Sequence, residues 1–173
     1  MKKTIQPIIT CLLLLIFLEG CNKKQSLKTI EVMSYNIHIA SPPSILPEFS
    51  STDLQAVANV IIREKPDLAA LQEVDAYTVR SGKTSHQAKD LAALTGMFYH
   101  FAGAVDRSEG VQGNAVLSRY PVLQAESFKL PTPEGSGGET RSLAITVLEV
   151  EGIRLAFMSV HLDHRSDKDR QFQ

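Results

Sequence analysis

Three polar residues each stand at the end of an apolar run in this sequence. Asn36 ends MSYN, Glu73 ends AALQE and His161 ends FMSVH. Such apolar runs predict strands, and ligand sites in layered folds often gather where strands end. A carboxylate and an amide oxygen are common ligand-binding groups, and the charge of a His is adjustable near neutral pH. The three residues are therefore candidates for a common ligand site.

Each of the three residues also has a purely structural interpretation. Asn36 could cap its strand through a side-chain turn. Glu73 could be a solvated carboxylate at the entrance to a loop, which is the usual place of a Glu. His161 could be a partly buried side chain with satisfied hydrogen bonds. Spacing alone does not decide between these interpretations.

Helices separate the strands that would position Asn36 and Glu73. Strands are expected over 29–36 and 67–74, with a helix between them that starts at Ser51-Thr52-Asp53 and ends near Glu64. A second helix is expected over 85–94, ended by Gly96.

The remaining segments predict further strands and at least one hairpin. Strands are expected over 97–104 and within 114–130, with a loop at 106–113. The runs 141–150 and 153–162 predict a hairpin that turns at Glu151-Gly152, and apolar residues on both faces favour a central place for both strands. The order predicts a mixed sheet covered by helices, an α/β or α+β fold.

Length and charge restrict the class of protein. The chain has 173 residues, enough for one domain with a proper core. Its net charge of -1 gives no indication of a broad basic face for nucleic acid, and a local basic groove is left open.

The N-terminus predicts an export signal. Two lysines precede an apolar run from Ile8 to Leu18, and Gly20-Cys21 follows. This run is shorter than the roughly 20 residues that a membrane-spanning helix needs. A buried helix of the fold and a plain secretory signal are the alternatives.

The segment LEGC resembles the lipobox of bacterial lipoproteins, which implies lipidation of Cys21. The expected organisation is a signal peptide at 1–20, the lipidated residue and a tether at 21–28, and one domain at 29–173. The protein would be exported and held by its lipid on a bacterial cell membrane or outer membrane. Loss of Cys11 with the signal would leave a single cysteine, so no disulfide framework is expected.

Four motifs in order resemble those of the endonuclease/exonuclease/phosphatase family. They are SYNIH, ALQEVD, GNAVLSRYP and SVHLDH, and the similarity runs from about Ile30 to Gln173. RSG at 80–82 and LTG at 94–96 resemble the bacterial metal-dependent hydrolase branch. The resemblance implies a four-layer α/β/β/α sandwich and hydrolysis of phosphoester bonds with Mg²⁺ or Mn²⁺.

The resemblance also implies roles for individual residues. Glu73 corresponds to the metal-binding carboxylate, and Asn36 to the Asn that helps to hold the metal region and the catalytic carboxylates. His161 corresponds to the His that contacts the scissile phosphate. Asn114 lies in the family's GNA segment near the site, and Arg141 corresponds to a basic residue that faces phosphate.

Four nearby charged residues have competing interpretations. Arg141 could be a surface charge at a strand edge, and Arg80 could either reach phosphate or be a solvated loop charge. Asp163 and His164 form H-x-D-H with His161, a pattern that can bind transition metals, but a salt link or a loop-ordering role is favoured. His38, His86 and His100 belong to no recognisable group of catalytic or metal-binding residues.

The end of the sequence bears on activity. Ser166-Asp167 predicts a helix start, but the family's later G-D-x-N and Asp-His motifs do not occur. The expectation is an N-terminal part of the domain with little activity by itself, since general-base help is absent.

The partners expected are a phosphoester of unknown type and a membrane; no protein partner is predicted. A non-catalytic lipoprotein remnant or binding protein is the alternative function, and an unrelated surface-binding domain is the least favoured.

Overall fold

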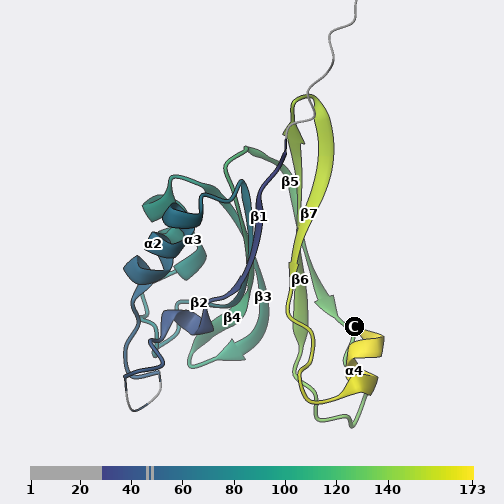
Figure 1. Cartoon of the computed structure of the whole chain (residues 1–173). Coiled ribbons are helices and arrows are strands. Elements are labelled where there is room, and N and C mark those ends of the chain that lie inside the picture. The colour runs from purple at the N-terminus through teal and green to yellow at the C-terminus, as the bar shows by residue number, and fades with distance from the viewer. Residues whose placement is uncertain (1–28, 46, 48) are drawn as a thin grey trace, which may run out of the picture.

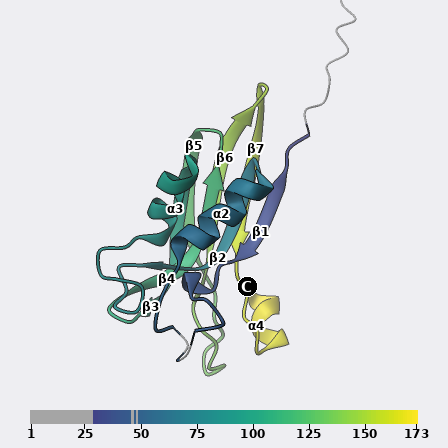
Figure 2. The same cartoon turned by 60° about the vertical axis from the view of Figure 1, so that its left-hand side comes forward.

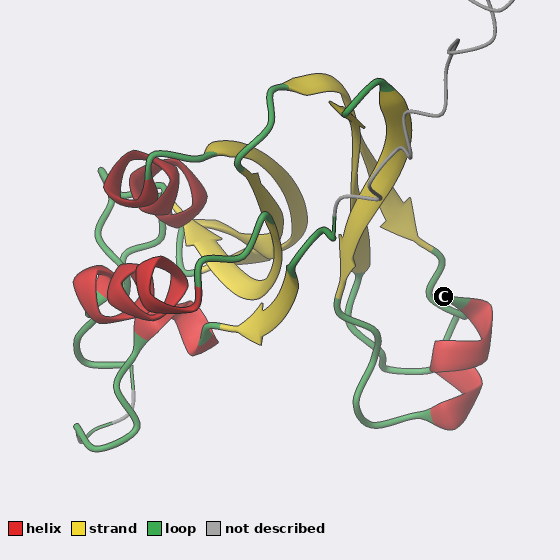
Figure 3. Ribbon diagram, turned by 45° about the horizontal axis from the view of Figure 1, so that its top comes forward, coloured by secondary structure: helices red, strands yellow, loops and turns green. Residues whose placement is uncertain are grey.

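Two β-sheets lie face to face, and two helices cover the outer side of one of them (Figure 1). The computed structural model describes residues 29–45, 47 and 49–173. The fold is the expected mixed α/β sandwich. The described residues supply one helical layer and both sheets, and in this part of the chain no helical layer lies on the outer face of the second sheet (Figure 3).

The first sheet has the strand order β1-β2-β4-β3. Parallel β1 (Val32–Asn36) and β2 (Leu68–Ala76) are followed by antiparallel β4 (Gly110–Ser118) and β3 (Phe98–Arg107). This sheet is mixed, as predicted.

The expected loop at 106–113 is wrong, because β3 and β4 continue through it to a tight hairpin. Both turn residues, Ser108 and Glu109, have positive φ, as two-residue hairpin turns require. The sequence lacks the Asn-Gly or Asp-Gly pair that usually signals such a turn.

Helices α2 (Leu54–Glu64) and α3 (Gln87–Thr95) lie next to each other across the first sheet (Figure 2). The carboxylate of Asp53 caps α2 by accepting a 2.8 Å hydrogen bond from the amide of Ala56, as the sequence predicts. One face of α2, which includes Ile61, is buried in the core against the sheet. A short 3-10 turn, η1 (His38–Ala40), follows β1.

The second sheet is antiparallel, in the order β5-β6-β7. It consists of β5 (Val122–Leu130), β6 (Arg141–Val150) and β7 (Ile153–Val160). The hairpin at Glu151-Gly152 is confirmed, and both residues have positive φ. Within the described part of the chain β6 is central but β7 is an edge strand, so apolar residues on both faces did not locate β7 correctly.

Polar ties and small apolar residues join the two sheets. Ala102 and Val116 of the first sheet are buried against Ala144 of the second. Ser159 on β7 donates a 2.9 Å hydrogen bond to the carbonyl of Leu71 on β2. Such contacts fix how the strand ends of one sheet face those of the other.

The last helix, α4 (Asp167–Phe172), lies at the lower end of the second sheet (Figure 1), and Ser166 caps it as predicted. None of the helices in the described residues is long and apolar enough to cross a membrane. The predicted signal peptide at 1–20, the lipidated Cys21 and the tether to residue 28 lie outside the described residues.

Candidate active site

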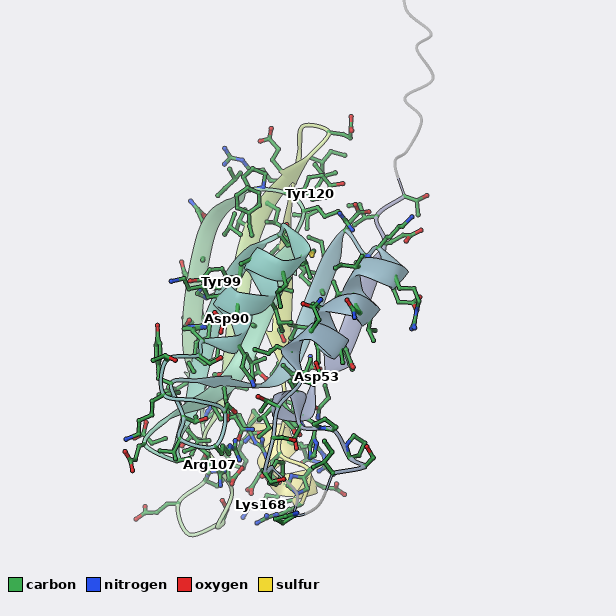
Figure 4. The ribbon with its side chains drawn as sticks, turned by 90° about the vertical axis from the view of Figure 1, so that its left-hand side faces the viewer. Asp53, Asp90, Tyr99, Arg107, Tyr120 and Lys168 are labelled. Carbon is green, nitrogen blue, oxygen red and sulfur yellow. The ribbon has the colours of Figure 1, made fainter. Side chains whose placement is uncertain are left out.

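A cavity of about 340 Å³ opens between the two sheets. Its walls include Glu73 and Arg107 from the first sheet and Arg141 from the second, together with His161, which follows β7. Figure 4 places Arg107 at the end of the molecule near Lys168 of α4, with Tyr120 at the opposite end. Four of the five residues predicted for the site therefore line one hollow: Glu73, Asn114, Arg141 and His161.

Glu73 is carried by an irregularity in β2. The pairing of β2 with β4 shifts register between Leu71 and Val74, and Glu73 has a φ of 55°. A non-glycine residue rarely adopts this conformation, and such backbones concentrate at functional sites. The bulge redirects the Glu73 side chain out of the regular alternation of the strand.

Asn36 holds the Glu73 carboxylate from the neighbouring strand. Parallel pairing sets Asn36 opposite Gln72. The Asn36 side-chain amide donates a 2.7 Å hydrogen bond to Oε1 of Glu73, and its Oδ1 accepts one of 2.9 Å from the amide of His38. Asn36 is not among the residues that line the cavity. Both of its polar atoms are engaged, so it orients Glu73.

His161 meets Glu73 across the gap between the sheets. Its Nδ1 lies 3.9 Å from Oε1 of Glu73. Burial lowers the pKa of His161 below its usual value, and the positive charges of Arg141 and His164 lower the pKa further. The carboxylates of Glu73 and Glu139 act in the opposite direction, but burial dominates. His161 is therefore a neutral imidazole at neutral pH, with one ring nitrogen able to donate a hydrogen bond.

The Arg141 side chain lines the cavity and is not a solvent-exposed charge at the edge of a strand. Its side chain is 11% exposed and lies 3.6 Å from Oδ2 of Asp163 and 3.7 Å from Oε2 of Glu139. The other oxygen of Glu139 accepts a 2.6 Å hydrogen bond from Arg107. This hydrogen bond lowers the pKa of Glu139, so the carboxylate stays charged between two guanidinium groups.

Asn114 lines the cavity but is also a tie between the sheets. It is 1% exposed. Its side-chain amide donates a 2.7 Å hydrogen bond to the carbonyl of Ser142 on β6. The donor that could have met a substrate is therefore committed to the second sheet.

The sequence model of the Endonuclease/Exonuclease/phosphatase family matches residues 33–173. The chain belongs to this family. Its fold is similar to that of an endonuclease/exonuclease/phosphatase from Beutenbergia cavernae DSM 12333, with a TM-score of 0.64 and 25% identity over 83% of this chain and 42% of that one. An endonuclease/exonuclease/phosphatase family protein from Leptotrichia buccalis C-1013-b gives a TM-score of 0.63 at 15% identity, over 82% of this chain and 58% of that one.

A third solved structure, ANGEL2, described as a 2',3'-cyclic phosphatase, gives a TM-score of 0.54 at 15% identity, over 77% of this chain and 40% of that one. The chain thus spans about half the length of these structures. No curated protein matches it.

Asp163 has the loop-ordering role that the sequence favoured. Its Oδ1 accepts hydrogen bonds from the amides of Arg165 at 2.7 Å and Ser166 at 3.0 Å. These hydrogen bonds lower the pKa of Asp163. Its other oxygen faces Arg141. The segment 163–166 is therefore a bend held by the Asp163 carboxylate.

The carboxylates and imidazoles around the cavity limit how the protein could bind a divalent metal. Within 29–45, 47 and 49–173, no group of three or more His, Cys, Asp or Glu side chains could hold an ion. Glu73 offers a single oriented carboxylate beside the cavity. Mg²⁺ commonly binds through one or two carboxylates, waters and substrate phosphate oxygens. The chemistry of Glu73 fits such a metal, and it does not fit an all-protein cage.

Among the charged and aromatic residues that line the cavity, the sequence prediction assigned no role to His38 and did not point to Phe49, Arg107 or Glu139. Arg80 was considered there, with a solvated loop charge favoured, and this interpretation is wrong. Its side chain is 19% exposed, forms a two-pronged ion pair with Asp75 and lines the cavity. The signal was present in QEVD, because an Asp that continues a buried apolar strand needs a cationic partner once it is buried itself.

Proposed function

We propose that the protein is a divalent-metal-dependent phosphoester hydrolase of the family's bacterial branch, using Mg²⁺ or Mn²⁺. The observation that carries the proposal is the meeting of Glu73 and His161, 3.9 Å apart, across the two sheets. The cavity around them also carries Arg141, which suits phosphate because a guanidinium matches its geometry. A carboxylate for a hard ion, a neutral imidazole and a guanidinium are the groups that a phosphoester needs.

Each residue has a distinct role in this proposal. Glu73 would hold the metal, with Asn36 orienting its carboxylate. When bound, the metal stabilises negative charge on the attacked phosphate and the leaving oxygen. His161 would donate a hydrogen bond to a phosphoryl oxygen, and Arg141 would neutralise a second one. Asn114 supports the site by holding the two walls together.

The test combines hydrolysis with metal binding. Hydrolysis of bis(p-nitrophenyl) phosphate with Mg²⁺ and binding of Mn²⁺ by electron paramagnetic resonance would be measured for Glu73→Gln. We expect this variant to lose both. Glu64→Gln on α2, outside the cavity, is the matched control and should keep both. Unchanged hydrolysis in Glu73→Gln would refute the assignment. A folded wild type without either property would favour the non-catalytic lipoprotein instead.

We also propose that the protein is exported and anchored to a bacterial membrane through lipid on Cys21. The support is the Lys-Lys flank, the apolar run and LEGC in the sequence. Cys21→Ala should move the protein from the membrane to the soluble fraction. Cys11→Ala is the matched control and should remain bound. A Cys21→Ala protein that persists in the membrane fraction would contradict lipidation.

A further inference from the structure

Arg80 is fixed in the cavity wall by a buried carboxylate. Nε of Arg80 donates to Oδ2 of Asp75 at 2.8 Å, and Nη2 donates to Oδ1 at 2.9 Å. Asp75 has no exposed surface and also accepts hydrogen bonds from the hydroxyls of Thr78 and Ser81. The pair is thus part of a closed turn rather than a flexible surface contact.

The Arg80 guanidinium is contacted on its flat face by an aromatic ring, in addition to the hydrogen bonds that Asp75 accepts along its edge. Its Cζ lies 5.4 Å from the ring centre of Phe49, a distance at which a cation is attracted to an aromatic ring. The two hydrogen bonds to Asp75 use two of the five N–H donors of an arginine. Among the described residues, no other acceptor is hydrogen-bonded to Arg80. The remaining donors belong to a side chain that lines the cavity.

Arg80 stands apart from the cations already assigned to the reacting phosphate. Arg141 contacts Glu139, Asp163 and His164 on the second-sheet wall. Arg80 follows β2 on the first-sheet wall, and its contacts are Asp75 and Phe49. The carboxylates that face the same hollow are Glu73 and Glu139. The cavity therefore has cations on both walls, since Arg141 lies on the second-sheet wall and Arg80 and Arg107 lie on the first. Arg107 is hydrogen-bonded to the Glu139 carboxylate, and Glu73 and His161 meet between the sheets.

We propose that Arg80 binds a second anionic group of the substrate, so that the site takes phosphoesters that carry another phosphate beside the scissile one. This inference rests on the proposed function, because it assigns the reacting phosphate to Glu73, His161 and Arg141. A guanidinium held by Asp75 loses little freedom when it binds an anion. Arg80 would then select doubly anionic substrates over esters of neutral alcohols.

The test is binding of pyrophosphate and orthophosphate in EDTA, measured by isothermal titration calorimetry. Wild type should bind pyrophosphate more tightly than orthophosphate. Arg80→Gln should weaken pyrophosphate binding by roughly 10- to 100-fold, the effect of one lost charged hydrogen-bonding group. Arg80→Lys keeps the charge without the planar fork and should weaken it by about tenfold. Arg154→Gln is the control, because it removes the same charge from an exposed site at the start of β7.

The outcomes separate this inference from the proposed function. Circular dichroism establishes whether each variant folds. If Arg80→Gln unfolds because the buried Asp75 has lost its cationic partner, binding by Arg80→Lys decides. The inference would be overturned if the wild type bound both anions equally or bound neither. It would also be overturned if folded Arg80 variants bound pyrophosphate as tightly as the wild type. This test measures anion binding and not hydrolysis. Failure of the Glu73→Gln test therefore does not affect the binding result for Arg80, and failure of the Arg80 test does not affect the result for Glu73.

Discussion

Nδ1 of His161 lies 3.9 Å from Oε1 of Glu73, although Glu73 lies in the first sheet and His161 directly follows a strand of the second. Glu73 is displaced by the bulge in β2, and His161 follows the last residue of β7. Neither strand alone makes the pair. Their approach depends on inter-sheet ties such as the Ser159 hydroxyl on the Leu71 carbonyl. The geometry of the site therefore depends on how the two sheets pack against each other.

The charges around His161 predict opposite responses to two substitutions. We expect its pKa to lie below 6.5 in metal-free protein, because burial disfavours the imidazolium. Arg141→Gln removes a lowering charge and should raise the pKa of His161. Glu73→Gln removes a raising charge and should lower it further. The measurement is an NMR titration of the His161 ring protons in EDTA.

His86 is the internal control for that titration. Burial lowers its pKa too, but its charged neighbours are Asp90 and Lys89. Its titration should be the same in both variants. A His161 pKa that shifts in the same direction in both, or not at all, would contradict the arrangement of charges around Glu73.

The same lowered pKa values predict how stability depends on pH. The unfolded chain takes up protons on histidine near pH 6.5, before folded His161 and His86 do. Their contribution to stability is therefore present above pH 6.5 and is lost as the pH falls through the folded pKa values. Urea unfolding should show a decline between pH 7 and 5 that is smaller in His161→Gln. Glu139 and Asp163 act only at lower pH, since their pKa values are lowered from 4.5 and 3.8.

Sequence patterns selected the site residues well but did not predict the contacts between them, and Glu73 lies at a bulge within β2 and not at its end. Asn36, Glu73 and His161 end apolar runs, so periodicity and the family motifs were enough to select them. The 3.9 Å approach of His161 to Glu73 could not be predicted, because it depends on how two separate sheets pack.

The interpretation of Arg80 as a solvated loop charge was wrong for a different reason. Its surroundings, TVRSGKTS, have the composition of a solvated loop. The turn instead wraps its hydroxyls and guanidinium around Asp75, whose burial depends on the sheet beneath it. The β3–β4 hairpin was missed for a local reason, since Ser108 and Glu109 adopt positive φ without the residues that usually favour it.

Asn36 should affect metal binding through the orientation of Glu73. Asn36→Ala removes the 2.7 Å hydrogen bond to Oε1 and leaves the carboxylate free to rotate. Loss of such a supporting partner typically weakens metal binding by about 10- to 100-fold. Titration of Mn²⁺ by electron paramagnetic resonance would measure it. Asn59→Ala on the exposed side of α2 is the control and should bind like wild type. Full affinity in Asn36→Ala would show that Glu73 needs no such support.

Asn114 should affect stability more than chemistry. Asn114→Ala deletes a fully buried amide and its 2.7 Å hydrogen bond to the Ser142 carbonyl, one of the ties between the sheets. The Ser142 hydroxyl also loses its 3.3 Å contact with this amide, although it keeps a hydrogen bond to the Ala102 carbonyl. We expect the free energy of unfolding in urea to fall by about 1–3 kcal/mol, the cost of a buried polar group left without its partner. Asn59→Ala should change it by less than about 0.5 kcal/mol. If Asn114→Ala keeps wild-type stability but loses substrate binding, Asn114 faces the ligand and the tie to Ser142 is dispensable.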